Sequence, residues 1–190
     1  TIYHFAGSSF TVDSLKYPQN TLLTNINGTV HLLEAVRKFS PSTKVFIAGS
    51  SEIFFLDRDQ KINRINEESK RLPRNPYGVS HLAISSLAHI YKQVHKLQIT
   101  LGLFFNHESS YRSPQFVSRK ISHGMAGVKL KNLPPLKLGN FSSRRDWGSA
   151  EEYVEGARKL MEADIFGEFV FGTGTSKTVR ELLEISAKTA

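Results

Sequence analysis

The sequence predicts an α/β protein built on a parallel sheet with flanking helices. Two observations predict this class. Short apolar runs alternate along the 190 residues with longer segments in which apolar residues recur every three or four positions. Those longer segments can form the right-handed crossover helices that parallel strands require. Parallel sheets bind ligands at the carboxyl ends of their strands, so the segment after each strand is a candidate site.

Four apolar runs have the length and composition of buried strands. They are residues 2–6, 44–48, 100–105 and 168–171. Polar or glycine-containing segments follow them, at residues 6–9, 49–52, 106–112 and 172–175. If the strands are parallel, these segments lie along one edge of the sheet, and they are where we look for functional residues.

Amphipathic spacing predicts the helices between the strands. Leu22, Ile26 and Leu33 belong to the apolar stripe of a helix over residues 18–39, and Pro18 suits its first turn. Ala83, Leu87 and similar residues predict a second helix over residues 77–96. Shorter helices are expected at residues 116–126, 150–163 and 179–188.

Composition excludes several classes of protein. No cysteine is present, so disulfides, cysteine-ligated zinc and thiol nucleophiles are excluded. No apolar run approaches the roughly 18 residues that suggest a membrane span. The net charge of +8 leaves nucleic-acid binding open, but the basic residues are dispersed, and their longest runs are pairs such as Arg144-Arg145.

Polar residues with catalytic potential follow the second predicted strand. Ser50 and Glu52 stand at its end, where they could simply cap the next turn. Tyr77 opens the next helix, and His81 is four residues later, so the two share a helix face. A hydroxyl, a carboxylate and a tyrosine near one strand end are a candidate acid–base set.

Several motifs, in order along the chain, resemble the extended short-chain dehydrogenase/reductase superfamily and, within it, the GDP-mannose 4,6-dehydratase family. The family's Thr-Ser-Glu-Leu-Tyr segment is similar to residues 50–54, and its active-tyrosine motif is similar to residues 75–77. The tyrosine motif alone is weak evidence. The specific signal is an ordered set: Asn-His-Glu-Ser at 106–109, Arg-Lys-Ile at 119–121, Leu-Gly-Asn at 138–140 and Arg-Asp-Trp-Gly at 145–148.

The resemblance implies a Rossmann-like parallel sheet with flanking helices, the later part of an extended dehydrogenase/reductase fold, plus part of a small substrate-binding lobe. Residues 1–110 would be the remaining part of the NAD(P)-binding domain. Residues 111–190 would be mainly the substrate-binding lobe, with a strand and a helix returning to the sheet. The family's Gly-rich phosphate loop has no counterpart here, and the chain starts at Thr1. We therefore expect a fragment that lacks the N-terminal Gly-rich part.

The function implied is conversion of GDP-mannose to GDP-4-keto-6-deoxymannose by internal hydride transfer through NADP or NAD. The resemblance assigns catalysis to Tyr77 as the base for the C4 hydroxyl, Glu52 as the base at C5, Ser50 as the hydroxyl that holds the C4 oxygen, and His81. His81 departs from the family, which has a lysine there. An imidazole is mostly neutral at pH 7, so it supplies little of the lysine's field.

The resemblance also implies binding residues. Contacts to the cofactor are expected from Phe5, Ala6, Gly7, Ser8, Ser9, His81, His107 and Arg112. Contacts to the nucleotide-diphosphate sugar are expected from Asn106, Arg119, Lys120 and Arg145, since guanidinium groups suit phosphate oxygens. No metal site is expected.

Three hypotheses remain at this point. The chain is a cytoplasmic NAD(P)-dependent lyase that acts on a nucleotide sugar, GDP-mannose by resemblance, and forms a homodimer or a higher homo-oligomer. Alternatively, it is a truncated and catalytically impaired homologue that serves as a nucleotide-sugar-binding or assembly protein. The third hypothesis, binding of nucleic acid by a basic α/β domain, is disfavoured, and neither nucleic acid nor a membrane is an expected partner.

Overall fold

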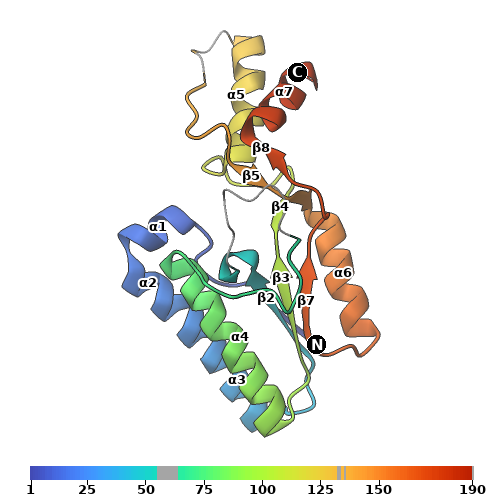
Figure 1. Ribbon diagram of the computed structural model, residues 1–190. Coiled ribbons are helices and arrows are strands. Elements are labelled where there is room, and N and C mark those ends of the chain that lie inside the picture. The colour runs from blue at the N-terminus through green and yellow to red at the C-terminus, as the bar shows by residue number, and fades with distance from the viewer. Residues whose placement is uncertain (55–63, 132–133, 135, 190) are drawn as a thin grey trace. The chain divides into compact units, whose positions relative to one another are not determined.

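The computed structural model describes residues 1–54, 64–131, 134 and 136–189 (Figure 1). The chain divides into two compact units. The first comprises Thr1–Phe104 and Val154–Phe171, and the second comprises Phe105–Tyr153 and Gly172–Ala190. Residues 55–63, between the second predicted strand and the helix expected at 77–96, lie outside the described residues.

The first unit is built on a four-stranded parallel sheet, which confirms the predicted fold class. The strands are β1 (Ile2–His4), β2 (Val45–Ser50), β3 (Ile99–Phe104) and β7 (Glu168–Phe171), and they lie side by side in that order. Each neighbouring pair is parallel, with Ile47 opposite Leu101 and Leu103 opposite Val170. β1 ends two residues earlier than predicted, so Phe5 and Ala6 belong to the turn that follows it.

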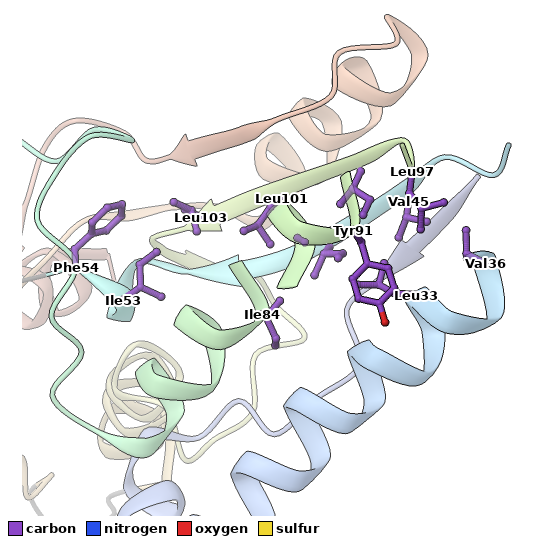
Figure 2. Close-up of a cluster of buried hydrophobic side chains, with 13 residues drawn as sticks. Leu33, Val36, Val45, Ile53, Phe54, Ile84, Tyr91, Leu97, Leu101 and Leu103 are labelled. Carbon is purple, nitrogen blue, oxygen red and sulfur yellow. The ribbon is translucent and has the colours of Figure 1, made fainter. Parts of the chain in front are cut away.

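Two long helices cover one face of this sheet. They are α3 (Gly28–Phe39) and α4 (Pro76–His95), which lie side by side in Figure 1. The core in Figure 2 gathers Leu33 from α3, Ile84 from α4 and alternate residues of the two central strands. Period-2 alternation sends the intervening residues to the other face, where the Phe46 and Phe104 rings lie 5.9 Å apart.

The opposite face is covered by the later part of α6 (Ala150–Glu162). Its Ala157 and Met161 are buried, and a Cβ added to Gly156 would lie 2.8 Å from the Phe171 ring. Gly102 of β3 has a similar role, because a Cβ there would lie 2.7 Å from the Phe46 ring. The aromatic layer on this face therefore needs glycine at both positions.

The predicted helix over 18–39 is interrupted. Its residues form α2 (Pro18–Leu22), a π-helix labelled η1 (Leu23–Asn27) and then α3. The π-helix lies where Asn25 is buried and its side chain bonds outside its own helix. A further helix, α1 (Thr11–Lys16), was not predicted. Its Val12 and Leu15 are exposed, and its six residues are too few to show an apolar period in the sequence.

The second unit is made of short strands and two helices. β4 (Asn106–Glu108) pairs in parallel with β6 (Trp147–Ser149), and β5 (Arg144–Arg145) pairs antiparallel with β8 (Lys177–Thr178). Its helices are α5 (Val117–Lys131) and α7 (Val179–Thr189), which extend the predicted ones, and the boundary between the units falls inside α6. Over the described ranges, no helix combines the length and the apolar character needed to cross a bilayer.

Candidate functional site

The candidate catalytic residues lie at the carboxyl end of β2 and at the start of α4. After β2, residues Ser51–Ile53 form a short 3-10 turn, η2, and Ser50 caps it. The Ser50 hydroxyl accepts a hydrogen bond from the Glu52 amide at 3.2 Å. Ser50 therefore does cap the next turn, as the alternative to a catalytic role predicted. It leaves the hydroxyl proton of Ser50 able to donate to a ligand, because the oxygen acts as the acceptor in the cap.

Helix α4 begins with residues that are typical of a helix N-terminus. Asn75 has an extended backbone, and its Oδ1 accepts from the Gly78 amide at 2.7 Å, while Pro76 occupies the first helical position. The other half of the Asn75 amide reaches the segment after β2, since Nδ2 donates to Glu52 Oε2 at 2.9 Å. A Cβ on Gly78 would lie 2.5 Å from the Glu52 carbonyl oxygen, so the two segments touch through their backbones as well.

Tyr77 and His81 contact each other, as their spacing predicts. Their ring centroids lie 4.4 Å apart with an interplanar angle of 65°, so one ring presents its edge to the other. His81 is 9% exposed, and burial lowers its pKa to about 4. The imidazole is therefore neutral at pH 7. Its Nδ1 is buried and has no hydrogen-bond partner within the described part of the chain.

The turn after β1 is fixed to this site by Asn25, a residue that the sequence analysis did not select. Asn25 Oδ1 accepts from the Ser8 amide at 2.7 Å, and its Nδ2 donates to the Ser8 carbonyl at 3.2 Å and to Ser80 Oγ at 3.0 Å. Ser80 Oγ in turn donates to the Tyr77 carbonyl at 2.7 Å. The feature of the sequence that could have indicated this role is that Asn25 is a polar residue within an otherwise amphipathic helical pattern.

Apart from His81, the residues expected to contact a cofactor on this unit form one continuous segment after β1. Phe5 stacks on Phe46 at 5.9 Å and is half exposed, and a Cβ on Gly7 would lie 2.9 Å from Asn25 Oδ1. Ala6, Gly7 and Ser9 are exposed, and Ser8 is half-buried. The exposed turn and the unsatisfied Nδ1 of His81 fit a polyhydroxylated cofactor such as a dinucleotide, because buried polar atoms require partners.

In the second unit, two further candidates are held by its own side chains. His107 Nδ1 lies 3.0 Å from the Phe105 carbonyl oxygen, and its ring lies 5.4 Å from that of Tyr153. Arg112 is within 3.2 Å of Glu108 Oε2, and its guanidinium lies 3.6 Å from the centroid of the Phe116 ring. Both side chains are therefore already oriented by neighbours.

The candidate substrate residues are less closely associated. Asn106 lies opposite Trp147 in the β4–β6 pair, which brings it beside the segment that contains Arg145. Arg145 donates to the Arg144 carbonyl at 2.7 Å, while Arg119 and the exposed Lys120 lie on α5. None of the hydrogen bonds or ion pairs recorded for the described residues joins Arg119, Lys120 and Arg145 to one another.

The second unit carries most of the net positive charge. Its residues include 11 Lys and Arg against 6 Asp and Glu, which leaves a net charge of +5 out of +8. Among the described residues, no group of His, Asp and Glu side chains could hold a metal ion. The arrangement thus offers a hydroxyl, a carboxylate and a phenol in one unit and an excess of cations in the other.

Comparison with known proteins gives a consistent set of relatives. The family model described as GDP-mannose 4,6 dehydratase matches residues 1–190. A GDP-mannose 4,6-dehydratase of Sinorhizobium fredii is 34% identical over 185 residues, covering 96% of this chain and 52% of the relative. The human GDP-mannose 4,6 dehydratase is 34% identical, covering 97% of this chain and 50% of the relative. The chain thus spans about half the length of these curated relatives.

Solved structures show the same fold. A structure of RMD from Pseudomonas aeruginosa complexed with NADPH has a TM-score of 0.89 at 25% identity, covering 96% of this chain and 63% of that one. DesIV, a dTDP-glucose 4,6-dehydratase from Streptomyces venezuelae with NAD bound, has a TM-score of 0.86 at 22% identity and covers 98% of this chain and 56% of that one.

Proposed function

The chain belongs to the GDP-mannose 4,6-dehydratase family, and from this premise we propose that it takes part in dehydration of a GDP-hexose, GDP-mannose first among them, to the 4-keto-6-deoxy sugar. The observation that carries the proposal is the joining of Glu52 to the first turn of the Tyr77 helix. Asn75 bridges the two at 2.9 Å, so a carboxylate and a phenol lie on adjoining segments at the strand ends where substrates of parallel sheets bind.

Each catalytic side chain has a distinct task in this proposal. Tyr77, as the phenolate, accepts the proton of the C4 hydroxyl, and Ser50 donates a hydrogen bond to the C4 oxygen. Glu52 then removes the C5 proton, which the C4 ketone makes acidic, and returns a proton to the C6 hydroxyl, which leaves as water. A carboxylate suits that step because Glu and Asp are among the side chains that serve as general bases.

Bound NADP or NAD would supply hydride chemistry that no side chain can provide. The residues proposed to hold it are the turn Phe5-Ala6-Gly7-Ser8-Ser9 and His81 in the first unit, with His107 and Arg112 in the second. The unsatisfied His81 Nδ1 supports this placement, because a ribose hydroxyl would satisfy it. Relatives of the same fold carry NADPH or NAD in their solved structures.

The second unit is proposed to be mainly the substrate-binding lobe. Asn106, Arg119, Lys120 and Arg145 would hold the nucleotide diphosphate, and the net charge of +5 supports an anionic ligand. In this assignment residues 1–104 and 154–171 are the remaining part of the NAD(P)-binding domain. The assignment refines the boundary expected at residue 110.

The proposal includes a homodimer in the cytoplasm. Its support is the set of apolar side chains that α3 and α4 expose, among them Phe39 at 85% and Val94 at 64% exposure. Light scattering on the purified chain should give twice the monomer mass. Val94→Lys should lower that mass, whereas Leu130→Lys on α5 should leave it unchanged.

The function itself is tested on the chain joined to the Gly-rich N-terminal part of a relative, which is incubated with GDP-mannose and NADP in D2O before the sugar is analysed by mass spectrometry. The proposal expects GDP-4-keto-6-deoxymannose with deuterium at C5, and Glu52→Gln should abolish C5 labelling while affecting oxidation at C4 less. GDP-mannose binding without turnover would instead support the impaired homologue, to which the neutral His81 gives some weight. Deuterium at C5 in the Glu52→Gln product would refute the role of Glu52.

A further inference from the structure

Asn75 makes two side-chain contacts with different partners. Its Oδ1 accepts from the Gly78 amide at 2.7 Å, which is an ordinary helix cap. Its Nδ2 donates to Glu52 Oε2 at 2.9 Å across 23 residues of sequence. Capping requires only the oxygen, and Ser or Asp would serve about equally well. The nitrogen is what distinguishes asparagine here, because an amide can cap through its oxygen and still donate to a carboxylate through its nitrogen.

The backbone around Asn75 keeps the two contacts together. The Val79 amide donates to the Asn75 carbonyl at 3.0 Å, which secures the residue to the first turn of α4. Gly78 packs so closely on η2 that a Cβ would lie 2.5 Å from the Glu52 carbonyl oxygen and 2.9 Å from Pro73 Cβ. The backbone of Glu52 is therefore fixed against the helix start, and the Asn75 amide fixes the side chain.

We propose that Asn75 is a positioning residue that orients the carboxylate of Glu52 relative to the helix that carries Tyr77. The inference rests on the proposed function, in which Glu52 is the C5 base. An amide donor orients a carboxylate without adding a positive charge, whereas a lysine or arginine partner would stabilise the anion and weaken it as a base. With Oε2 held by Asn75, the other oxygen, Oε1, is the one that accepts the C5 proton.

The contact is tested first by a thermodynamic cycle on the purified chain. Asn75→Asp keeps the cap, because an aspartate oxygen also accepts from the Gly78 amide, but it places a second carboxylate against Glu52. We expect the unfolding equilibrium constant to rise about tenfold. Combining it with Glu52→Gln should recover most of that loss, because the introduced glutamine amide can donate to the introduced aspartate and re-form the bond with donor and acceptor exchanged.

A residue that only caps the helix would give a different result. The Asn75→Asp substitution would then have the same effect in the wild-type background and in the Glu52→Gln background, and no rescue would occur. A coupling of less than twofold between positions 75 and 52 overturns the inference. Asn75→Ser is the matched control, since its hydroxyl caps the helix but is too short to reach Glu52, and Asn75→Ala reports the loss of both contacts.

The consequence for catalysis is tested by a reaction that needs only the base. GDP-4-keto-6-deoxymannose is incubated with the chain in D2O, and deuterium at C5 is followed by NMR against a protein-free sample. Asn75→Ser should lower the kcat of exchange about tenfold with KM unchanged, because the substrate contacts are elsewhere. Exchange by Asn75→Ser at the wild-type rate overturns the positioning role.

The two proposals fail separately. A wild-type chain that labels no C5 position counts against the proposed function, and the thermodynamic cycle then decides by itself whether Asn75 tethers Glu52. A chain that exchanges C5 but shows no coupling between positions 75 and 52 retains the proposed function and loses Asn75 as its positioning residue.

Discussion

The two units of the molecule hold their candidate functional residues in different ways. In the first, Ser50, Glu52 and Tyr77 lie on segments joined by hydrogen bonds between strand ends and the start of α4. In the second, Arg119, Lys120 and Arg145 share no recorded bond among the described residues, and Arg145 is bonded to the backbone of its neighbour. The candidate catalytic residues of the first unit are also more buried: His81 is 9% exposed, whereas Lys120 in the second unit belongs to the exposed class.

This difference corresponds to two kinds of chemistry. Proton transfer needs closely positioned groups, and hydrogen bonds hold the segments that carry Ser50, Glu52 and Tyr77 in the first unit. Binding of a diphosphate depends more on the total positive charge and on flexible cations that close around it. The comparison leads to four predictions, and the largest concerns the buried imidazole of His81.

The titration of His81 should make the stability of the chain depend on pH. Burial holds the folded pKa at about 4, whereas an unfolded histidine titrates near 6.5. Between these values the unfolded state binds a proton that the folded state does not, so stability is fully present above pH 6.5 and is lost as pH falls towards 4. The expected loss is about 3 kcal/mol.

Urea unfolding of the wild type and of His81→Gln, at a series of pH values from 7 to 4, measures this loss. The Gln variant should show a shallower fall, because it removes one titrating group. His4→Gln removes the other imidazole whose pKa is lowered by burial. Comparing the two variants shows how much each histidine contributes to the change of unfolding free energy with pH. Parallel curves for wild type and His81→Gln would mean that the imidazole is not held in its neutral form.

Gly78→Ala should reduce stability by about 2–3 kcal/mol, because its Cβ would lie 2.5 Å from a backbone oxygen that cannot rotate away. The matched control is Gly28→Ala at the start of α3, which meets nothing within 4 Å and has the helical φ of −56°. That control should be neutral or slightly stabilising. Equal losses in the two variants would show that the contact between η2 and α4 is loose.

Arg145→Ala should weaken GDP binding by about 2 kcal/mol, the usual range for a hydrogen bond to a charged group. Calorimetry at two salt concentrations measures it, and the affinity of the wild type should fall as salt rises. Lys188→Ala, which removes the same charge from the end of α7, is the control. If both variants bind GDP equally, net charge rather than a specific contact accounts for the affinity.

Sequence patterns predicted the first unit better than the second, for a physical reason. The strands at residues 45–50 and 99–104 and the helix at 76–95 are buried on one or both faces, so burial imposes a hydrophobic period on them. The strands β4, β5, β6 and β8 have two or three residues each. Such short elements are too brief for any period to show.

The candidate residues could be selected from the sequence, whereas most of the contacts between them could not. The resemblance supplied Ser50, Glu52 and Tyr77, and the four-residue spacing supplied the contact of Tyr77 with His81. Neither could reveal that Asn25 binds Ser8 and Ser80, because that contact depends on a π-helix that interrupts a regular pattern. The Asn75 tether was hidden as well, because the same residue already explained the helix start.

The smallest effect expected is a gain from His81→Lys. An ammonium beside the Tyr77 ring would stabilise the phenolate, and tenfold more phenolate corresponds to about 1.4 kcal/mol. Turnover at pH 7 should therefore rise about tenfold, and the gain should shrink as pH approaches 10, where the phenolate forms without help.

Burial opposes the change, because a lysine at a position with 9% exposure loses part of its own charge to desolvation. His81→Gln is the neutral control, and it should show no gain in turnover over the wild type at pH 7. Equal profiles for His81→Lys and wild type would mean that the face of α4 has repacked around the imidazole and that the cation is not what limits the rate.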